Sequence, residues 1–450
     1  MLAPLCYPIA GHVPYWIIDR FGFLETCAAS GSETFGLKLG KSTYLLNCHE
    51  DIKHVLETNY TNYTKNARLR DREGKRLFGE GVQTQSGDKH KQQRRRIQPV
   101  FMRKAIAAFS PQIVAVVDQQ LARWESQAEI DIAKESLWLV HCVLGKVLFG
   151  LDFNQPVSQS AHQSDRAFGD AVLARRRQVN RQFSLRIPSA KMSITGRSTS
   201  YSQSMQLLEL SVDQMIQDRR DRPTEYQDLL SVLVQIQSSR GNMGGKQMRD
   251  EALAISGGYE TIAAVLIWTW YLLGQHLEVK DMLLQEVVQI IGDRTPTAED
   301  IPSLKYTKRV MDESLRLYPP TWIFTRSAQQ LDTLPSGSRL QPGAKLYLSS
   351  YLVHRNPAYF PEPEKFDPAR FSKAEKAARP DFAYFPFGGG PRVCIGQTLA
   401  ETVAMLILVT MAQRIQLTLI PHQTITKRTL TTLLPKQPLK MQVHRSGIAQ

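Results

Sequence analysis

The chain has 450 residues, of which 42% are hydrophobic and 22% charged, proportions typical of an ordinary soluble globular protein. Its 56 Lys and Arg residues outnumber its 42 Asp and Glu residues, and the resulting net charge of +14 indicates an anionic partner, although no nucleic-acid motif accompanies it, so no nucleic-acid partner is expected. The five cysteines are odd in number and form no CxxC pair, which argues against a disulfide framework or a zinc site.

The N-terminal sequence shows no charged leader followed by an apolar segment and a small-residue cleavage site. The longest apolar stretches, 262–273 and 403–411, are shorter than the ~20 residues that a membrane span needs. We therefore expect a cytoplasmic protein without a membrane anchor. The most linker-like stretch, 238–246, is short, so residues 1–450 are predicted to form one domain, large enough to enclose a cofactor.

The first predicted element is a β-hairpin at 34–48, where alternating residues turn at Gly40-Lys41. Most of 50–330 has helical periodicity, including a basic helix at 90–96 and a long central helix at 248–275 that is apolar nearly all round. Further predicted elements are helices at 305–318 and 397–411 and strands at 344–352, 415–420 and 439–443. The pattern indicates a mainly α fold with small peripheral sheets.

Two arginine runs, 94–96 and 175–177, lie in helix-like sequence. Such a run by itself is more typical of a solvated helix face than of a binding site, and both are interpreted in that way at first.

The most informative stretch, 387–396, reads Phe-Gly-Gly-Gly-Pro-Arg-Val-Cys-Ile-Gly. Its glycines let the backbone pass close to a flat object, and Gly396 leaves room for a ring over the loop. Cys394 directly precedes a predicted helix, whose first amides and positive dipole end would stabilise a thiolate. A thiolate held in this way suits haem iron. A lone cysteine in a glycine-rich turn is more often inert. The interpretation as a haem ligand therefore depends on the spacing of the whole 387–396 stretch.

Three further motifs lie elsewhere in the chain. Glu313 and Arg316 stand three apart on one helix and can pair, with Arg370 available to complete a buried network, although Glu-x-x-Arg alone is usually a surface pair. Gly257-Gly-Tyr-Glu260-Thr261 places two glycines and an acid–alcohol pair in the central helix. The alternative there is a packing glycine pair with a threonine bonded to its own helix.

The last motif is cationic. His90 and Arg94 stand four apart on one helix and can face the same anion, and Arg326 and Arg392 occur later in the chain. Each of them taken alone is more typical of a surface base. As an ordered set they fit the two carboxylates of a haem.

The spacing F-x-x-G-x-R-x-C-x-G closely resembles the haem-binding signature of the cytochrome P450 family, and the other motifs occur in the order found there. The resemblance extends over nearly the whole chain. It implies the cytochrome P450 fold, with haem b between the central helix and the cysteine loop. In that fold Cys394 ligates iron, and Thr261 and Glu260 deliver protons. The implied cofactor-binding residues are Cys394, His90, Arg94, Arg326, Arg392, Phe387, Gly388, Gly396 and Gly257, and the structural residues are Glu313, Arg316 and Arg370.

The implied reaction inserts one atom of O2 into a lipophilic substrate, by hydroxylation or epoxidation, with electrons ultimately from NAD(P)H. No flavin or nicotinamide domain fits in this length, so we expect an acidic ferredoxin or flavodoxin with its reductase, which suits the +14 charge. Two alternatives remain open: a peroxide-driven peroxygenase or isomerase on the same scaffold, and a non-enzymatic haem sensor or ligand carrier. An intact acid–alcohol pair favours the monooxygenase.

By family position the substrate pocket would draw on 68–85, the central helix, 321–325 and 429–434. These segments are apolar and partly aromatic, which indicates a terpenoid, fatty acid or polyketide, although the same residues would equally suit plain core. The predicted pocket residues are Leu77, Phe78, Leu253, Trp322, Ile323, Phe324, Leu430 and Leu433.

Overall fold

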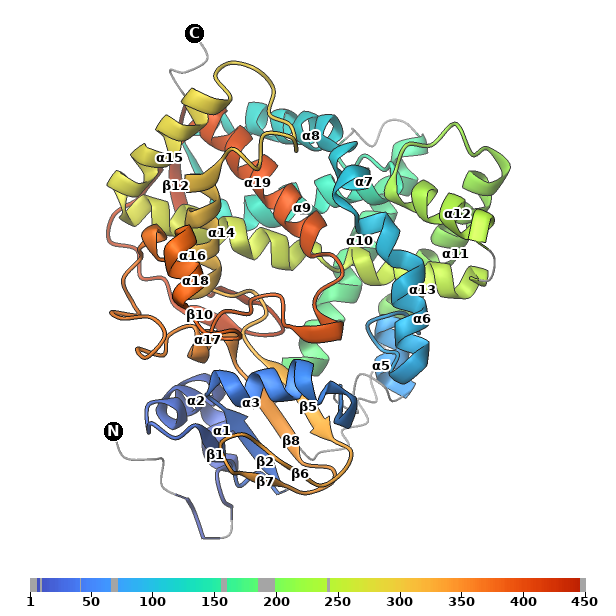
Figure 1. The fold of residues 1–450 in the computed structure, drawn as a ribbon. Helices are drawn as coiled ribbons and strands as arrows, with labels where there is room; N and C mark the ends of the chain where they lie inside the picture. The colour runs from blue at the N-terminus through green and yellow to red at the C-terminus, as the bar shows by residue number, and fades with distance from the viewer. Residues whose placement is uncertain are drawn as a thin grey trace.

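The structure is a computed structural model that describes residues 6–8, 10–40, 42–65, 72–154, 160–184, 199–240 and 243–445. Helices dominate this part of the chain, and the strands gather in small sheets at its edge (Figure 1). The α-helices are α1 (Val13–Ile18), α2 (Arg20–Ala28), α3 (His49–Lys53), α5 (Arg72–Phe78), α6 (Gly87–Ile97), α7 (Arg103–Ala107), α8 (Ser110–Trp124), α9 (Ile132–Phe149), α10 (Ser160–Ser184), α11 (Thr199–Asp221), α12 (Leu229–Arg240), α13 (Gly245–Ser256), α14 (Tyr259–Gln275), α15 (Leu277–Ile290), α16 (Lys305–Leu317), α17 (Ser350–Val353), α18 (Lys373–Ala378) and α19 (Gln397–Arg414).

The largest sheet has the order β1-β2-β8-β5-β3 and lies beside α1, α2 and α3, apart from most of the helices (Figure 1). Its first pair confirms the predicted hairpin, with Thr34 opposite Leu46. Three smaller sheets follow, β4-β12-β9, β10-β11 and β6-β7. The strands are β1 (Thr34–Gly36), β2 (Thr43–Leu46), β3 (Tyr63–Thr64), β4 (Glu129–Asp131), β5 (Phe324–Ala328), β6 (Asp332–Thr333), β7 (Arg339–Leu340), β8 (Lys345–Leu348), β9 (Ile415–Leu419), β10 (Lys427–Thr429), β11 (Leu433–Pro435) and β12 (Lys440–Arg445).

The core of the helical part is built around α14, which packs against α9, α16 and α19. Its side chains are buried on nearly every side, as its apolar sequence predicts. The stretch Gly245–Gln275 has the length and apolar character of a membrane span, and it is the one such stretch found among the described helices. Its most apolar window is 72% buried in the fold, so it serves here as the central core helix.

Two predicted elements differ from the structure. The helix predicted at 248–275 is divided into α13 and α14, because the backbone turns at Gly257 and Gly258. The strand predicted at 344–352 ends at Leu348, where the Ser349 side chain accepts a hydrogen bond from the Leu352 amide and begins α17. In both places local hydrogen bonding ends an element that the hydrophobic pattern alone would continue.

Candidate haem-thiolate site

The cysteine loop is held in place by its own backbone and by a neighbouring segment. The Cys394 amide donates to the Phe387 carbonyl at 3.0 Å, and the Gly388 amide donates to the Phe385 carbonyl at 3.0 Å. Gly388 and Gly390 have φ angles of +74° and +63°, which side chains disfavour. A Cβ atom on Gly390 would overlap the Leu56 carbonyl. A Cβ atom on Gly396 would meet no atom closer than the Phe101 ring, at 4.0 Å. The loop therefore needs glycine at several positions.

The Cys394 thiol borders a cavity of about 190 Å³, and Cys394 lies three residues before Gln397, the first residue of α19. Burial raises the pKa of the Cys394 thiol, whereas the Gly396 amide, the Arg94 guanidinium and Lys65 lower it. The net effect is a raised pKa, so the Gly396 amide and the nearby cations offset only part of the cost of a thiolate, while the thiol itself is exposed to the cavity. The cavity is lined by Thr261, Ile262, Val265, Met311, Leu315, Pro320, Thr321, Phe324, Pro386, Phe387, Cys394, Ala400, Glu401 and Ala404.

Thr261 lies on α14 and lines the same cavity as Cys394. Its hydroxyl donates to the Gly258 carbonyl at 2.8 Å, at the turn between α13 and α14. A Cβ atom on Gly257 would meet only the Ala254 carbonyl, at 3.5 Å, so no other element fills the space beside this glycine. The cavity thus lies between a helix that bends at two glycines and a loop that presents a thiol.

Cationic side chains gather near Cys394, and their charges act on one another. His90 is buried, and desolvation together with the charges of Arg392, Lys65 and Arg94 lowers the pKa of its imidazole to about 3. Burial and the charge of Arg392 lower the pKa of Arg326 to about 10. The Arg94 guanidinium donates to the Val393 carbonyl at 2.8 Å. The structure brings together all four bases that the sequence motif singled out.

Lys65 is a fifth member of this cluster and was not among the residues predicted from the sequence. Its ammonium donates to the Gln83 carbonyl at 2.9 Å, and desolvation with the charges of Arg326, Arg392 and Arg94 lowers the pKa of Lys65 to about 7. Within the described part of the chain, no carboxylate forms a salt bridge with Lys65, His90, Arg94 or Arg326. Buried cations without a counter-charge are costly, so the cluster fits a dianionic group. No motif surrounds Lys65, and only the fold could reveal it.

Glu260 points from α14 toward α10 and the β10–β11 turn. Its carboxylate forms an ion pair with Arg176 and accepts a hydrogen bond from the Asn180 amide at 3.1 Å. The same guanidinium donates to the hydroxyls of Thr431 and Thr432 at 2.9 and 2.6 Å. Burial alone would raise the pKa of Glu260, but Arg176 and the hydrogen bonds from Thr432 and Asn180 lower it. Glu260 is therefore a carboxylate in the folded protein.

The interpretation of the run at 175–177 as a solvated face was wrong for its first two residues. Arg175 is buried, and its guanidinium donates to the carbonyls of Leu77, at 2.9 and 2.7 Å, and of Leu253. Arg176 is the partner of Glu260. Helical periodicity places both residues on α10 but does not reveal which elements cover them.

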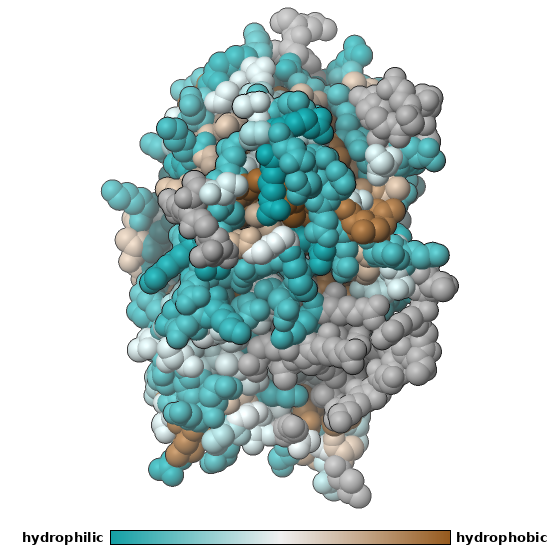
Figure 2. Space-filling model, turned by 90° about the vertical axis from the view of Figure 1, so that its right-hand side faces the viewer, coloured by the Kyte–Doolittle hydropathy of each residue, from teal (hydrophilic) through white to brown (hydrophobic). Residues whose placement is uncertain are grey.

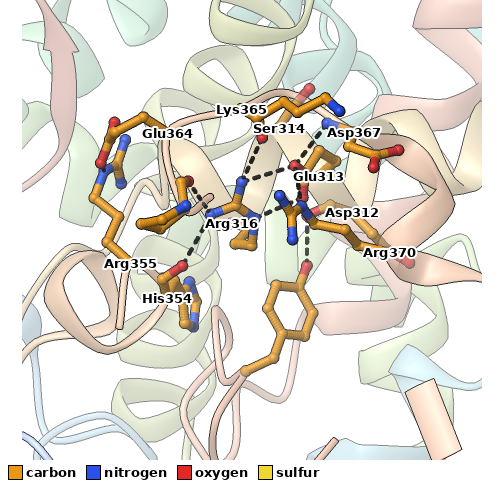
Figure 3. Close-up of polar contacts among 12 residues, drawn as sticks. Asp312, Glu313, Ser314, Arg316, His354, Arg355, Glu364, Lys365, Asp367 and Arg370 are labelled. Carbon is orange, nitrogen blue, oxygen red and sulfur yellow. Dashed lines mark hydrogen bonds and ion pairs between the residues drawn. The ribbon is translucent and has the colours of Figure 1, made fainter. Parts of the chain in front are cut away.

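Glu313 and Arg316 form a fully buried, bidentate pair on α16, with N–O distances of 2.6 and 2.7 Å (Figure 3). The remaining guanidinium hydrogens reach the carbonyls of His354, Pro363 and Lys365 at 2.7–3.0 Å. Arg370 approaches Glu313 at 3.6 Å. The three residues that the sequence grouped therefore meet, and the network joins α16 to the chain between 354 and 370.

Of the predicted pocket residues, Phe324 is the one that lines the cavity beside Cys394. Trp322 and Leu433 instead lie in a core cluster with α2 and the largest sheet, and the Trp322 indole donates to the Leu430 carbonyl at 3.0 Å. Both residues are packed in this core, where the Trp322 ring contacts the ring of Phe21 on α2. Ile323 packs against that cluster, and Leu77 and Leu253 are buried. Residues 68–71 of the predicted segment 68–85 lie outside the described residues.

These residues fit a haem. A thiol with an amide donor faces the cavity from one side, a helix with a glycine turn borders it on another, and a cluster of cations lies nearby. Cys394 would ligate the iron, and Lys65, His90, Arg94, Arg326 and Arg392 would hold the two propionates.

Comparison with known proteins agrees with this geometry. The family model described as Cytochrome P450 matches residues 4–444. The chain is 31% identical over 434 residues to cyclooctat-9-en-7-ol 5-monooxygenase of Streptomyces melanosporofaciens, covering 94% of this chain and 90% of that protein. It is 28% identical over 445 residues to pentalenene oxygenase of Streptomyces avermitilis, covering 98% and 96%.

Among solved structures, the crystal structure of the cytochrome P450DA heme domain matches with a TM-score of 0.85 at 21% identity, covering 98% of this chain and 97% of that one. The fold is therefore that of the cytochrome P450 heme domain. The chain belongs to the cytochrome P450 family and is a monooxygenase of that family, so the predicted fold class is confirmed.

Proposed function

We propose that the chain uses haem b and O2 to hydroxylate or epoxidise an olefinic substrate of the terpenoid class, with electrons from a separate acidic donor. The observation that carries the proposal is the cavity in which Cys394 and Thr261 meet among mainly apolar side chains, beside the cationic cluster. Ile262, Val265, Met311 and Phe324 favour an apolar ligand. Of the three substrate classes open from sequence, the terpenoid is favoured because pentalenene and cyclooctat-9-en-7-ol in the relatives' names are olefinic skeletons.

A thiolate-ligated haem supplies the electron density that favours O–O cleavage. The residues of the chain itself would position the substrate and deliver protons. The Thr261 hydroxyl, fixed by donating to the Gly258 carbonyl, keeps its lone pairs free to accept from an ordered water in the cavity. Glu260 would take up a proton from solvent when its carboxylate leaves Arg176 and would then pass that proton to the water. The apolar lining limits water and holds the substrate close to the reacting centre.

The first test asks whether Cys394 is the ligand. Cys394→Ala should abolish the thiolate-type carbon monoxide spectrum of the reduced protein, whereas Cys142→Ala, a change at a buried cysteine of α9, should leave it intact. A normal spectrum in the Cys394 variant would end the haem-thiolate interpretation.

The second test addresses the reaction. Olefinic terpenoids, fatty acids and polyketides are screened for shifts of the haem spectrum, and a ligand that binds is then offered with a ferredoxin and its reductase or with hydrogen peroxide alone. Product that depends on the reductase supports the proposal. Equal product with peroxide alone would support a peroxygenase, and binding without product from either would support a sensor or carrier. A cytoplasmic location remains part of the proposal and is tested by fractionation.

A further inference from the structure

Glu251 is a fully buried acid on α13 that no part of the proposed chemistry uses. Its Oε1 atom accepts hydrogen bonds from the Val82 amide at 2.7 Å and from the Gln93 side chain. It forms no ion pair with any residue that the structure describes, and its Oε2 atom is buried without a hydrogen-bond partner. Burial raises the pKa of Glu251 to about 7, which shows how poorly the fold compensates its charge.

The loop at 79–85 is built around this carboxyl group. A Cβ atom on Gly81 would lie 2.8 Å from Oε2 of Glu251, so the loop can approach only where it has no side chain. The adjacent acid, Asp250, accepts from the Glu80 amide at 2.9 Å but is paired with Lys246 at 2.7 Å near the surface. Of the two acids, Asp250 has a cation and Glu251 has none. An acid retained at such a cost indicates a positional role.

The loop and the helix that Glu251 contacts both lead to the cationic cluster. The Gln83 carbonyl accepts from Lys65 at 2.9 Å, and the Gln85 carbonyl accepts from Arg392 at 3.1 Å. Gln93 lies on α6, directly before Arg94 and three residues after His90. One carboxyl group therefore fixes the backbone that holds two of the basic side chains, Lys65 and Arg392, and the helix that carries two others, His90 and Arg94.

We propose that Glu251 is a positioning residue for the cationic cluster, which it orients toward the haem propionates through the 79–85 loop and α6. This rests on the haem site of the proposed function. The positioning depends on Oε1 of Glu251, which accepts hydrogen bonds from both Val82 and Gln93. Loss of that oxygen frees the loop and the helix together, and the bases then no longer converge.

The experiment measures how fast haem leaves the holoprotein for an excess of apomyoglobin, alongside thermal melting of each variant. Glu251→Ala should release haem at least about tenfold faster, the low end of what partners behind a cofactor's direct ligands contribute. Glu251→Gln keeps an oxygen at the same place and should restore slow release. Glu135→Ala is the matched control, because Glu135 likewise accepts two side-chain hydrogen bonds, from Gln120 and Trp124, but joins α8 to α9 away from the cluster. It should lower the melting temperature without faster release.

Release from Glu251→Ala at the wild-type rate would overturn the proposal, as would equally fast release from Glu251→Gln or Glu135→Ala. If Glu251→Ala does not fold, Gln93→Met removes the contact with α6 alone and should also release haem faster; wild-type release would contradict the proposal. Wild-type protein that takes up no haem would overturn the proposed function as well, whereas haem-bound wild type with an unaffected Glu251→Ala variant would overturn this inference alone.

Discussion

At the scale of single residues, the motifs of the sequence located Cys394, Thr261 and the Glu313–Arg316 pair, because each motif has its members at a fixed spacing on one loop or helix. Residues without such a spacing could not be found. Lys65 and Arg392 are brought near one another across more than 300 positions, and the repulsion between their charges is visible only in the fold. Arg176 likewise has its partner, Glu260, 84 residues away.

Thr261 provides the residue-scale prediction. Thr261→Ala removes the hydroxyl of a residue that lines the cavity, so proton delivery within the cavity should become less selective. Haem binding and the carbon monoxide spectrum should remain, while product per reductant consumed falls and hydrogen peroxide rises. The measurement is product and peroxide per reductant, with a substrate from the spectral screen.

Thr269→Ala is the control for that experiment, since Thr269 also donates to its own helix, to the Val265 carbonyl at 2.7 Å, but is fully buried in the core. Its coupling should equal that of the wild type. If Thr261→Ala couples as well as Thr269→Ala, the relay assignment is wrong and the peroxygenase or isomerase alternative gains support.

At the scale of elements, the buried Glu313–Arg316 pair joins α16 to backbone carbonyls that lie 38 to 49 residues after Arg316. Burial raises the pKa of Glu313, while Arg316 lowers it, so the pair holds a charged group in the core only as long as both members are present. The hydrophobic pattern predicted a helix at 305–318, and α16 ends one residue before that limit, at Leu317. It could not predict the carbonyls of His354, Pro363 and Lys365, because these lie in irregular backbone that has no periodicity.

Arg316→Ala should therefore destabilise the protein by about 3–5 kcal/mol, because it leaves Glu313 buried without a cation. Loss of soluble protein or of haem content is the expected result, with chemical denaturation as the measurement where the variant folds. Arg222→Ala removes a half-exposed arginine paired with Glu225 and should change the free energy of unfolding by less than about 1 kcal/mol. Equal stability of the two variants would contradict a structural role for Arg316.

At the scale of the whole molecule, basic side chains on the surface contribute to the net charge of +14 along with those in the interior. Lys91 and Arg95 lie on the exposed side of α6, whose other side carries His90 and Arg94. Figure 2 views the molecule from the side on which α6 and α11 lie, and most described side chains on that face are hydrophilic. The exposed bases Lys91 and Arg95, rather than hydrophilicity alone, would suit an acidic electron donor.

Charge reversal at Arg95, Arg95→Glu, should slow reduction by an acidic ferredoxin or flavodoxin, and the effect should be largest at low salt, where screening is weak. Stopped-flow reduction rates over a range of ionic strength measure it. Lys134→Glu, on α9, makes the same change of charge elsewhere on the surface. Equal slowing by both variants would mean that net charge alone matters, and no slowing by either would place the docking face elsewhere.

The contact of Arg176 with Glu260, Thr431 and Thr432 has a mechanical consequence. One guanidinium fastens three parts of the chain, α10, α14 and the β10–β11 turn, so α10 cannot lift away without breaking all of these bonds at once. Once α10 has left, Glu260 loses the Arg176 cation and the Asn180 hydrogen bond that lower its pKa. The pKa of Glu260 would then rise, and the carboxylate would bind a proton at a higher pH than in the closed form. Opening of this side of the molecule and proton uptake are therefore a single thermodynamically linked event, and acidic conditions should favour the opened form.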